Sequence, residues 1–219
     1  MKRIVFSLAV ICVMIMFVAC GNSHSFKITG TIEGANDKDT LILTHALKTG
    51  VILDTILVKD GKFSYTGHAD SLQLCLIFLK RETSINSVFF IEPGEIKMRL
   101  SPDHDRCRAE GTPANDQWKL LNDSVDNYGN AINLMVTALY DDKSLSLEEK
   151  SDSVQSLVQG KYREMNQCIV GFAERNITNE FGLFLLQYYG DDVIDSLQRQ
   201  RLVQMMPKKL ANRLKNTAQ

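Results

Sequence analysis

The spacing of apolar residues changes near Gly111, and this change constrains the fold of the chain most. Before Gly111, apolar and polar residues alternate, as in 26–34, where Phe26, Ile28 and Ile32 are separated by polar residues or glycine. After it, apolar residues recur every three or four positions. Alternation is typical of half-buried strands, and the longer spacing is typical of amphipathic helices. The sequence therefore predicts an α+β chain, with a β-rich part followed by a helical part.

The β-rich part is expected over residues 26–111. Asp60-Gly61 lies between two strand-like runs and predicts a hairpin, because glycine tolerates positive φ. The stretch 72–79 is apolar on both faces, which is typical of a central strand. Short strands separated by turns predict an antiparallel β-sandwich-like domain. The strands are expected at 26–34, 40–44, 51–58, 63–66, 72–79, 87–91 and 96–100.

The helical segment is expected over residues 112–219. The sequence predicts about four helices, which begin near Pro113, Ser146, Phe181 and Asp195. A short loop between the first two predicts an antiparallel pair. The apolar stripe of the first helix, from Trp118 to Leu139, has two interpretations: it packs in the core, or it forms the interface of a helix-mediated oligomer.

The N-terminal stretch has the layout of an export signal. Lys2 and Arg3 precede an apolar run that ends at Ala19-Cys20. This run is short for a membrane span, which needs about 20 residues. The stretch resembles a bacterial lipoprotein signal, although Phe17 stands where that family usually has Leu. The resemblance implies that residues 1–19 are removed, that Cys20 is lipidated, and that residues 20–25 form a tether.

The resemblance also implies a location in the cell envelope. A lipid anchor on Cys20 would hold the chain on a membrane, since several acyl chains give stable attachment. In bacterial lipoproteins that carry a signal for export to the cell surface, acidic residues usually follow the lipidated cysteine. Residues 21–25 contain no acidic residue. We therefore expect a lipid-anchored protein of the outer membrane that faces the periplasm.

Composition excludes some partners. The chain has 25 Lys and Arg against 26 Asp and Glu, so its net charge is −1. This balance provides no electrostatic footprint for nucleic acid, and no nucleic-acid partner is expected. The basic tail at 208–215 is interpreted as a solvated helix end. With 44% apolar residues, the chain has the composition of a folded, core-forming protein.

The cysteines suggest one candidate reactive group. None is spaced as Cys-x-x-Cys. Cys75 lies in an apolar strand and is expected to pack in the core, and Cys168 lies beside a helix stripe and is expected to do the same. Cys107 lies between Arg106 and Arg108, and adjacent positive charge stabilises a thiolate. It is either a redox thiol or a surface loop thiol, and a Cys107–Cys168 bridge remains open.

The sequence predicts no other catalytic or metal-binding arrangement. We therefore expect a protein that is not an enzyme and that binds no metal or cofactor. The four histidines, at positions 24, 45, 68 and 104, are scattered. Adjacent ligand types in Asp103-His104-Asp105 do not point the same way, so a solvated turn is expected. Glu92 and Glu95 flank a turn and are interpreted as turn residues rather than as a catalytic carboxylate pair.

A triplet of aspartate, hydroxyl residue and aliphatic residue recurs six times. It is similar to the O-glycosylation motif of exported Bacteroidetes proteins. The alternative is that aspartate, serine and threonine simply favour caps and turns before apolar elements. Both interpretations stay open. The hydroxyl residues of the triplets are Thr40, Thr55, Ser71, Ser124, Ser153 and Ser196.

A series of weak motifs resembles a known family when their order is considered. They are Phe26-x-Ile-x-Gly-x-Ile, Asp60-Gly61-x-Phe, Gly67, Phe90-Ile-Glu-Pro-Gly and Gly111-Thr-x-x-Asn-Asp. Together they resemble the domain of unknown function DUF4369, which precedes thioredoxin-like (AhpC/TSA) domains in Bacteroidetes lipoproteins. The later helices resemble the segment that joins the two domains. The resemblance implies a thioredoxin-like domain beyond this segment, and we expect this chain to lack it.

These observations support two functional hypotheses. The first is a non-catalytic binding or scaffolding lipoprotein, because the Cys-x-x-Cys site of the relatives is not in this sequence. Its expected partners are the membrane, through the anchor, and an envelope protein or a thioredoxin-like oxidoreductase. The second is a thiol-dependent redox accessory protein that uses Cys107.

Overall fold

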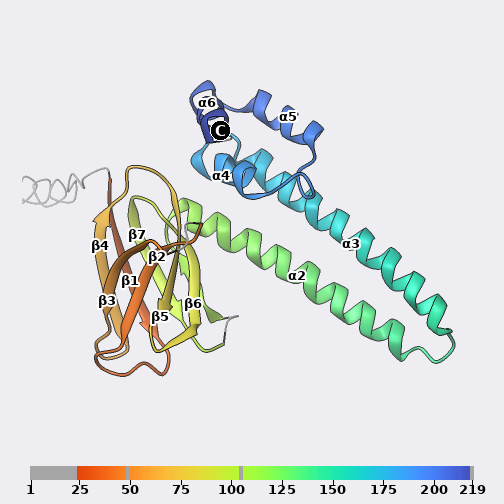
Figure 1. Ribbon diagram of the computed structural model, residues 1–219, viewed down its shortest axis with the longest axis horizontal. Helices are drawn as coiled ribbons and strands as arrows, with labels where there is room; N and C mark the ends of the chain where they lie inside the picture. The colour runs from red at the N-terminus through yellow and green to blue at the C-terminus, as the bar shows by residue number, and fades with distance from the viewer. Residues whose placement is uncertain (1–23, 48–49, 104–105, 218–219) are drawn as a thin grey trace, which may run out of the picture.

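The chain folds into a β-sandwich followed by helices, as the computed structural model shows (Figure 1). The structure describes residues 24–47, 50–103 and 106–217. The predicted α+β class is confirmed. The expected signal, the lipidation site Cys20 and His104 lie outside the described residues.

Two four-stranded sheets form the sandwich. The first has the order β4-β1-β7-β8 and the second the order β3-β2-β5-β6. The predicted central strand is β5, which lies between β2 and β6. The three-residue strand β8 was not predicted, because it is too short to show a period. The bounds are β1 Ser25–Ile32, β2 Thr40–His45, β3 Ile52–Leu57, β4 Lys62–His68, β5 Gln73–Leu79, β6 Glu82–Ile91, β7 Gly94–Leu100 and β8 Arg108–Glu110.

One strand pair corrects the expected antiparallel arrangement. β1 and β7 run parallel, with Ile28 opposite Ile96 and Ile32 opposite Leu100. All other strand pairs in the described residues are antiparallel. Sequence periodicity is the same for both kinds of pairing, because side chains alternate in either case. Strand direction therefore could not be derived from the spacing of apolar residues.

The predicted hairpin at Asp60-Gly61 is a turn between sheets rather than a paired hairpin. Both residues have positive φ, 50° and 67°, and two hydrogen bonds of 2.9 Å join Lys59 and Lys62. Beyond this bridge, however, β3 pairs with β2 and β4 pairs with β1. The local turn was correctly predicted, but the chain uses it to pass from one sheet to the other.

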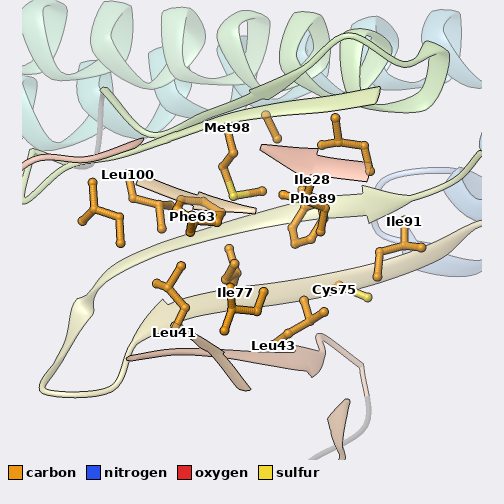
Figure 2. Packing of buried hydrophobic residues seen from close by; sticks show 14 of the residues in the cluster. Ile28, Leu41, Leu43, Phe63, Cys75, Ile77, Phe89, Ile91, Met98 and Leu100 are labelled. Atoms are coloured by element: carbon orange, nitrogen blue, oxygen red, sulfur yellow. The ribbon is translucent and has the colours of Figure 1, made fainter. Parts of the chain in front are cut away.

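The core of the sandwich lies between the two sheets (Figure 2). Ile28 and Ile96 from the first sheet face Ile77 and Phe89 from the second, and none of the four is exposed to solvent. Gly30 belongs to the same inner row of β1. A Cβ at this position would lie 2.3 Å from the Phe63 ring, so glycine allows that ring to approach the strand.

Five helices follow in the described residues, against the expected number of about four. The additional helix, α6, begins directly after Pro207, where the sequence predicts the end of the fourth helix. Proline is accepted at the start of a helix, and the Pro207 carbonyl accepts the amides of Leu210 and Ala211. The bounds are α2 Pro113–Asp141, α3 Leu147–Arg175, α4 Glu180–Tyr188, α5 Ser196–Met205 and α6 Lys208–Thr217.

The two long helices form an arm that extends away from the sandwich, while α4, α5 and α6 gather at its base (Figure 1). We call residues 122–141 of α2 and 147–168 of α3 the helical arm. All buried residues of α2 lie between Ala114 and Leu121, and those of α3 lie between Ile169 and Ala173. The arm therefore has an apolar seam between its helices but no fully buried residue. Among the described residues, no helix combines the length and apolar character needed to cross a membrane.

The base of the arm has a core of its own, which reaches the sandwich through the outer face of the second sheet. Phe90 packs edge-on against Trp118, Phe181 and Phe184, with ring centroids 4.8–5.6 Å apart. Its neighbour Phe89 points into the sandwich instead. Alternation along β6 thus assigns two adjacent phenylalanines to two different cores.

Candidate functional site

The first turn of α2 is fixed to the end of β6. The buried Asn115 side chain accepts the Phe90 amide (2.9 Å) and donates to the Phe90 carbonyl (2.8 Å), as a neighbouring strand would. Glu92 accepts the Ala114 amide (2.6 Å), because the helix start has amides without intrahelical partners. Glu92, expected to be a turn residue, therefore also caps α2. We call this arrangement the sheet–helix junction.

A pocket of about 240 Å³ lies beside the junction, between β6, β8 and α2. We call it the junction pocket. It is smaller than a typical pocket for a drug-sized ligand, and its size suits one or two side chains of a partner. Its lining residues are Asn86, Ser87, Val88, Cys107, Arg108, Ala109, Trp118, Lys119, Asn122, Asp123 and Asp126.

Cys107, the candidate redox thiol, is on the wall of this pocket and is half-buried. Its Sγ accepts the Ser101 amide and donates to the Ser101 carbonyl, both at 3.4 Å. Arg108 donates to the Cys107 carbonyl (2.8 Å) and lies 4.0 Å from Asp123. The positive charge next to the thiol is thus partly engaged elsewhere, and the thiol itself ties the β7–β8 connection together.

The pocket also has polar groups of both charge signs. Lys119 pairs with Glu110 at 3.3 Å, and Asp126 lies on the same wall. The Trp118 indole Nε1 is buried and has no hydrogen-bond partner among the described residues. A buried N–H without a partner is costly, and the Trp118 ring is held in place by the helical core. These groups can bind a polar side chain.

Among the residues that the structure describes, Cys75, Cys107 and Cys168 are all free, so the Cys107–Cys168 bridge is not formed. Cys75 is fully buried, as predicted, and burial raises the pKa of its thiol to about 12. Cys168 is partly buried against the helical core, which confirms the packing prediction. Among the described ranges, no three His, Cys, Asp or Glu side chains converge in the manner of a metal site.

The hydroxyl triplets fall in different environments. Thr55, Ser71 and Ser196 are exposed, whereas the hydroxyl residues at 40, 124 and 153 are half-buried. Asp195 forms a capping box with Gln198 at the start of α5, which is the structural role that the alternative interpretation expects. Glycosylation stays a prediction for the exposed hydroxyls.

Comparison with known proteins gives a match that covers the sandwich and the junction. Residues 26–118 match the model of the family described as Domain of unknown function (DUF4369). The DUF4369 match begins at the second residue of β1, covers the other seven strands and ends at Trp118, inside the first turns of α2. It therefore contains Glu92 and Asn115, which fix α2 to β6. No curated protein matches the chain.

The sequence did not indicate the pocket. Trp118 was predicted as part of an apolar stripe, which is correct, because its ring packs in the helical core. Lys119, Asn122 and Asp126 follow on the turns beside it and showed no pattern of their own. Their common location results from the way that α2 crosses β8, and only the fold supplies that information.

Proposed function

We propose that this chain is a non-catalytic binding or scaffolding protein of the bacterial cell envelope. In this proposal a lipid on Cys20 holds it at the outer membrane, and the folded part faces the periplasm. The lipoprotein-like stretch 1–20 supports the anchor, and the lack of acidic residues at 21–25 supports the periplasmic side. The matched domain of unknown function supports a relation to lipoproteins of the thioredoxin-associated kind.

The observation that supports the binding role is the exposure of apolar side chains on the helical arm. Leu134 and Leu147 are 74% and 82% exposed, and Met135, Tyr140 and Tyr162 are also exposed on the arm. Residues 127–140 contain no charged side chain. A helix that is open to solvent normally carries charges on that side, and exposed apolar surface is typical of protein contact sites.

The partner that we propose is a protein of the envelope, and a thioredoxin-like oxidoreductase is the specific candidate. The resemblance to lipoproteins that carry such a domain supports this choice. The sandwich would act as the platform, and the arm would reach the partner at a distance from the membrane.

Photo-crosslinking in intact cells tests the proposal. A photoreactive residue at Leu134 or at Leu147 of the full chain should label the same envelope protein from both positions. Met135→Lys should reduce both adducts, because a charge in the contact is costly to desolvate. Ile52 is the control position, since it is apolar and 62% exposed but lies on the sandwich.

The proposal fails if the arm positions give no adduct, or if Ile52 labels the same protein equally well. It also fails if the adducts contain only a second copy of the chain. That result would instead support an oligomer built through the helices, the alternative interpretation of the stripe from Trp118 to Leu139.

A second candidate function is a thiol-dependent redox accessory, and the location of Cys107 in the junction pocket favours it. A partner side chain in this pocket would lie beside the thiol. Cys107→Ser tests this function through mixed disulfides trapped in cells. The mixed disulfides should disappear in this variant and persist in Cys168→Ser, and unchanged mixed disulfides in Cys107→Ser would exclude the role.

A further inference from the structure

The outer face of the first sheet carries lysines and hydroxyl residues on neighbouring strands. On β1, the residues that alternate with the buried ones are Lys27, Thr29 and Thr31, and they point away from the core. The neighbouring strands continue this face with Lys62 on β4 and Lys97 on β7. Lysines and hydroxyl residues therefore share one side of three adjacent strands. We call this surface the lysine face.

Strand register places these side chains next to one another. Thr31 lies directly opposite Lys62, and Thr29 lies between Ser64 on one side and Lys97 on the other. Side chains directly opposite on one face of a sheet are within contact range. The hydroxyl groups of β1 thus form a row that is flanked by ammonium groups on both sides.

A hollow of about 690 Å³ lies over this face. Four lysines line it: Lys27, Lys59, Lys62 and Lys97, and all four are exposed. Lys59 comes from the turn between β3 and β4, so the charges come from three separate regions of the chain. No acidic residue lines the hollow. Its volume is in the range of small-ligand pockets.

The four ammonium groups have no ion pair with any described carboxylate. Some cations elsewhere are paired, such as Arg81 with Asp39 at 3.0 Å and Arg106 with Asp103 at 3.2 Å. Two glutamates border the face. Glu95 is opposite Lys27 but outside pairing distance, and Glu110 is opposite Lys97 but pairs with Lys119. The four ammonium groups of the hollow are therefore not directly paired, and these two glutamates lie at its border.

Like charges around one hollow repel one another. The net charge of the chain is −1, so an overall excess of positive charge does not explain why four lysines gather here. An anion placed among them removes this repulsion. Lysine ammonium groups act as mobile point charges and are common phosphate binders, whereas planar carboxylates are matched by the arginine fork, which is not in this hollow. Hydroxyl donors from threonine and serine also suit phosphate oxygens.

We propose that the lysine face binds a phosphate-bearing ligand. Lys62 and Lys97 contact phosphate oxygens from opposite sides of β1, and Thr29 and Thr31 donate hydrogen bonds between them. The source of the phosphate is either the headgroup of an anionic membrane lipid or a soluble phosphorylated molecule. The proposal does not depend on the helical arm. The lysine face lies on the first sheet, whereas the base of the arm packs on the second sheet, and phosphate binding differs in chemistry from apolar protein contact.

Binding of two probes to the full-length chain in mild detergent or in vesicles tests the proposal and separates the sources. The soluble probe is inorganic tripolyphosphate, and the lipid probe is a vesicle of phosphatidylcholine with or without phosphatidylglycerol. Lys62→Gln combined with Lys97→Gln should weaken binding at least about fivefold, as expected for two charge contacts at the surface. Lys208→Gln combined with Lys209→Gln removes the same charge from α6 and should change binding less than twofold.

Thr31→Glu provides a second variant that does not depend on losing a lysine. Glutamate at this position lies between Lys62 and Arg99 in the register, where opposite charges stabilise a sheet. The variant should therefore fold as well as the parent while it repels the probe. A structural role alone would not produce loss of binding at unchanged stability.

Site-dependent binding of tripolyphosphate alone assigns a soluble ligand, and site-dependent binding of the anionic vesicles alone assigns a lipid headgroup. Site-dependent binding of both probes supports the shared phosphate chemistry. Absence of binding to either probe overturns the proposal. An equal loss in the lysine-face pair and the α6 pair also overturns it, because binding would then follow net charge only.

Discussion

The β-sandwich and the helical arm have similarly regular sequences but differ in what covers them. Each sheet of the sandwich is covered on its inner face by the other, and residues such as Ile28 and Phe89 have no exposed surface. Beyond the base, each helix of the arm has the other helix as its main neighbour, and Ile132 and Leu157 are only half-buried. Regular local structure therefore does not by itself produce a core. A second layer is required.

This difference separates two roles within one chain. The sandwich, with a closed core, serves as a rigid body. The arm depends on its base, where Phe90 of the sandwich enters the aromatic cluster of Trp118, Phe181 and Phe184. Helical pairs without further packing are marginal in water, since most helical stability comes from tertiary contacts. The arm is thus the part that a partner can stabilise most.

The largest effects are expected at the two adjacent phenylalanines of β6. Phe89→Ala should destabilise the sandwich by about 3–5 kcal/mol, because it leaves a cavity between the sheets. Phe90→Ala should cost a similar amount but at the base of the arm, so the helices should loosen while the sandwich stays folded. Denaturant unfolding followed by far-ultraviolet circular dichroism measures the first effect, and region-resolved hydrogen exchange measures the second.

Leu134→Ala is the control for both phenylalanine variants, because an exposed arm residue should change stability by less than about 0.5 kcal/mol. If Phe89→Ala and Phe90→Ala produced the same regional pattern, the two cores would be one cooperative unit. The division into a body and an arm would then be wrong.

Asn115→Ala should have the next largest effect, a loss of about 2–3 kcal/mol. The substitution leaves the buried amide and carbonyl of Phe90 without partners, and buried polar groups without partners are costly. Asn122→Ala, two turns further along α2, is the matched control, since Asn122 is only half-buried. Thermal unfolding of both variants measures the difference. Equal melting temperatures would contradict a stabilising role for the Asn115 hydrogen bonds in the sheet–helix junction.

The fold class was predictable from the sequence because the spacing of apolar residues reflects local helix or strand geometry. The sequence predicted β5 as a central strand and Cys75 as a core residue for the same reason. It did not predict the parallel pairing of β1 with β7, because both pairing directions place alternate side chains on one face. The Asp60-Gly61 turn shows the same limit: its conformation is local, but the sheet that each flanking strand joins is decided by distant partners.

The surfaces were harder to predict than the fold. Lys27, Lys59, Lys62 and Lys97 are up to 70 positions apart in the sequence, which has a net charge near zero, so no linear pattern indicated a basic face. The charge cluster that was visible in the sequence, at 208–215, lies on the terminal helix α6. Cys107 was identified by its arginine neighbours, but its hydrogen bonds to Ser101 depend on how β7 and β8 meet.

A smaller and more local effect is expected at the tip of the arm. Ser146 accepts the Glu149 amide, and the Glu149 carboxylate accepts the Ser146 amide at 2.8 Å, which completes a capping box. Ser146→Ala should cost about 1 kcal/mol and should raise exchange only in the first turns of α3. Ser151→Ala, on the same helix but away from the cap, should leave exchange unchanged. An effect that reached the sandwich would contradict the independence of the two regions.

The smallest effect at neutral pH concerns Cys75. Its folded pKa of about 12 lies above the ordinary value of 9.0, so the thiol stays neutral in the fold. Its contribution to stability is therefore complete below about pH 9 and is lost as the pH rises from 9 toward 12, since the unfolded thiol ionises first. Alkylation followed by mass spectrometry should modify Cys107 in the folded protein and Cys75 only on unfolding. Equal rates at the two thiols would contradict the closed core.

The contrast between body and arm is tested most directly by native-state hydrogen exchange on the full-length chain. We predict the slowest exchange in β1, β2 and β5, and much faster exchange in residues 122–141 and 147–168, although both segments are continuous helices. Protection of the arm equal to that of β5 would show that it is part of one rigid body. The role of the arm as a loosely held, partner-binding element would then be contradicted.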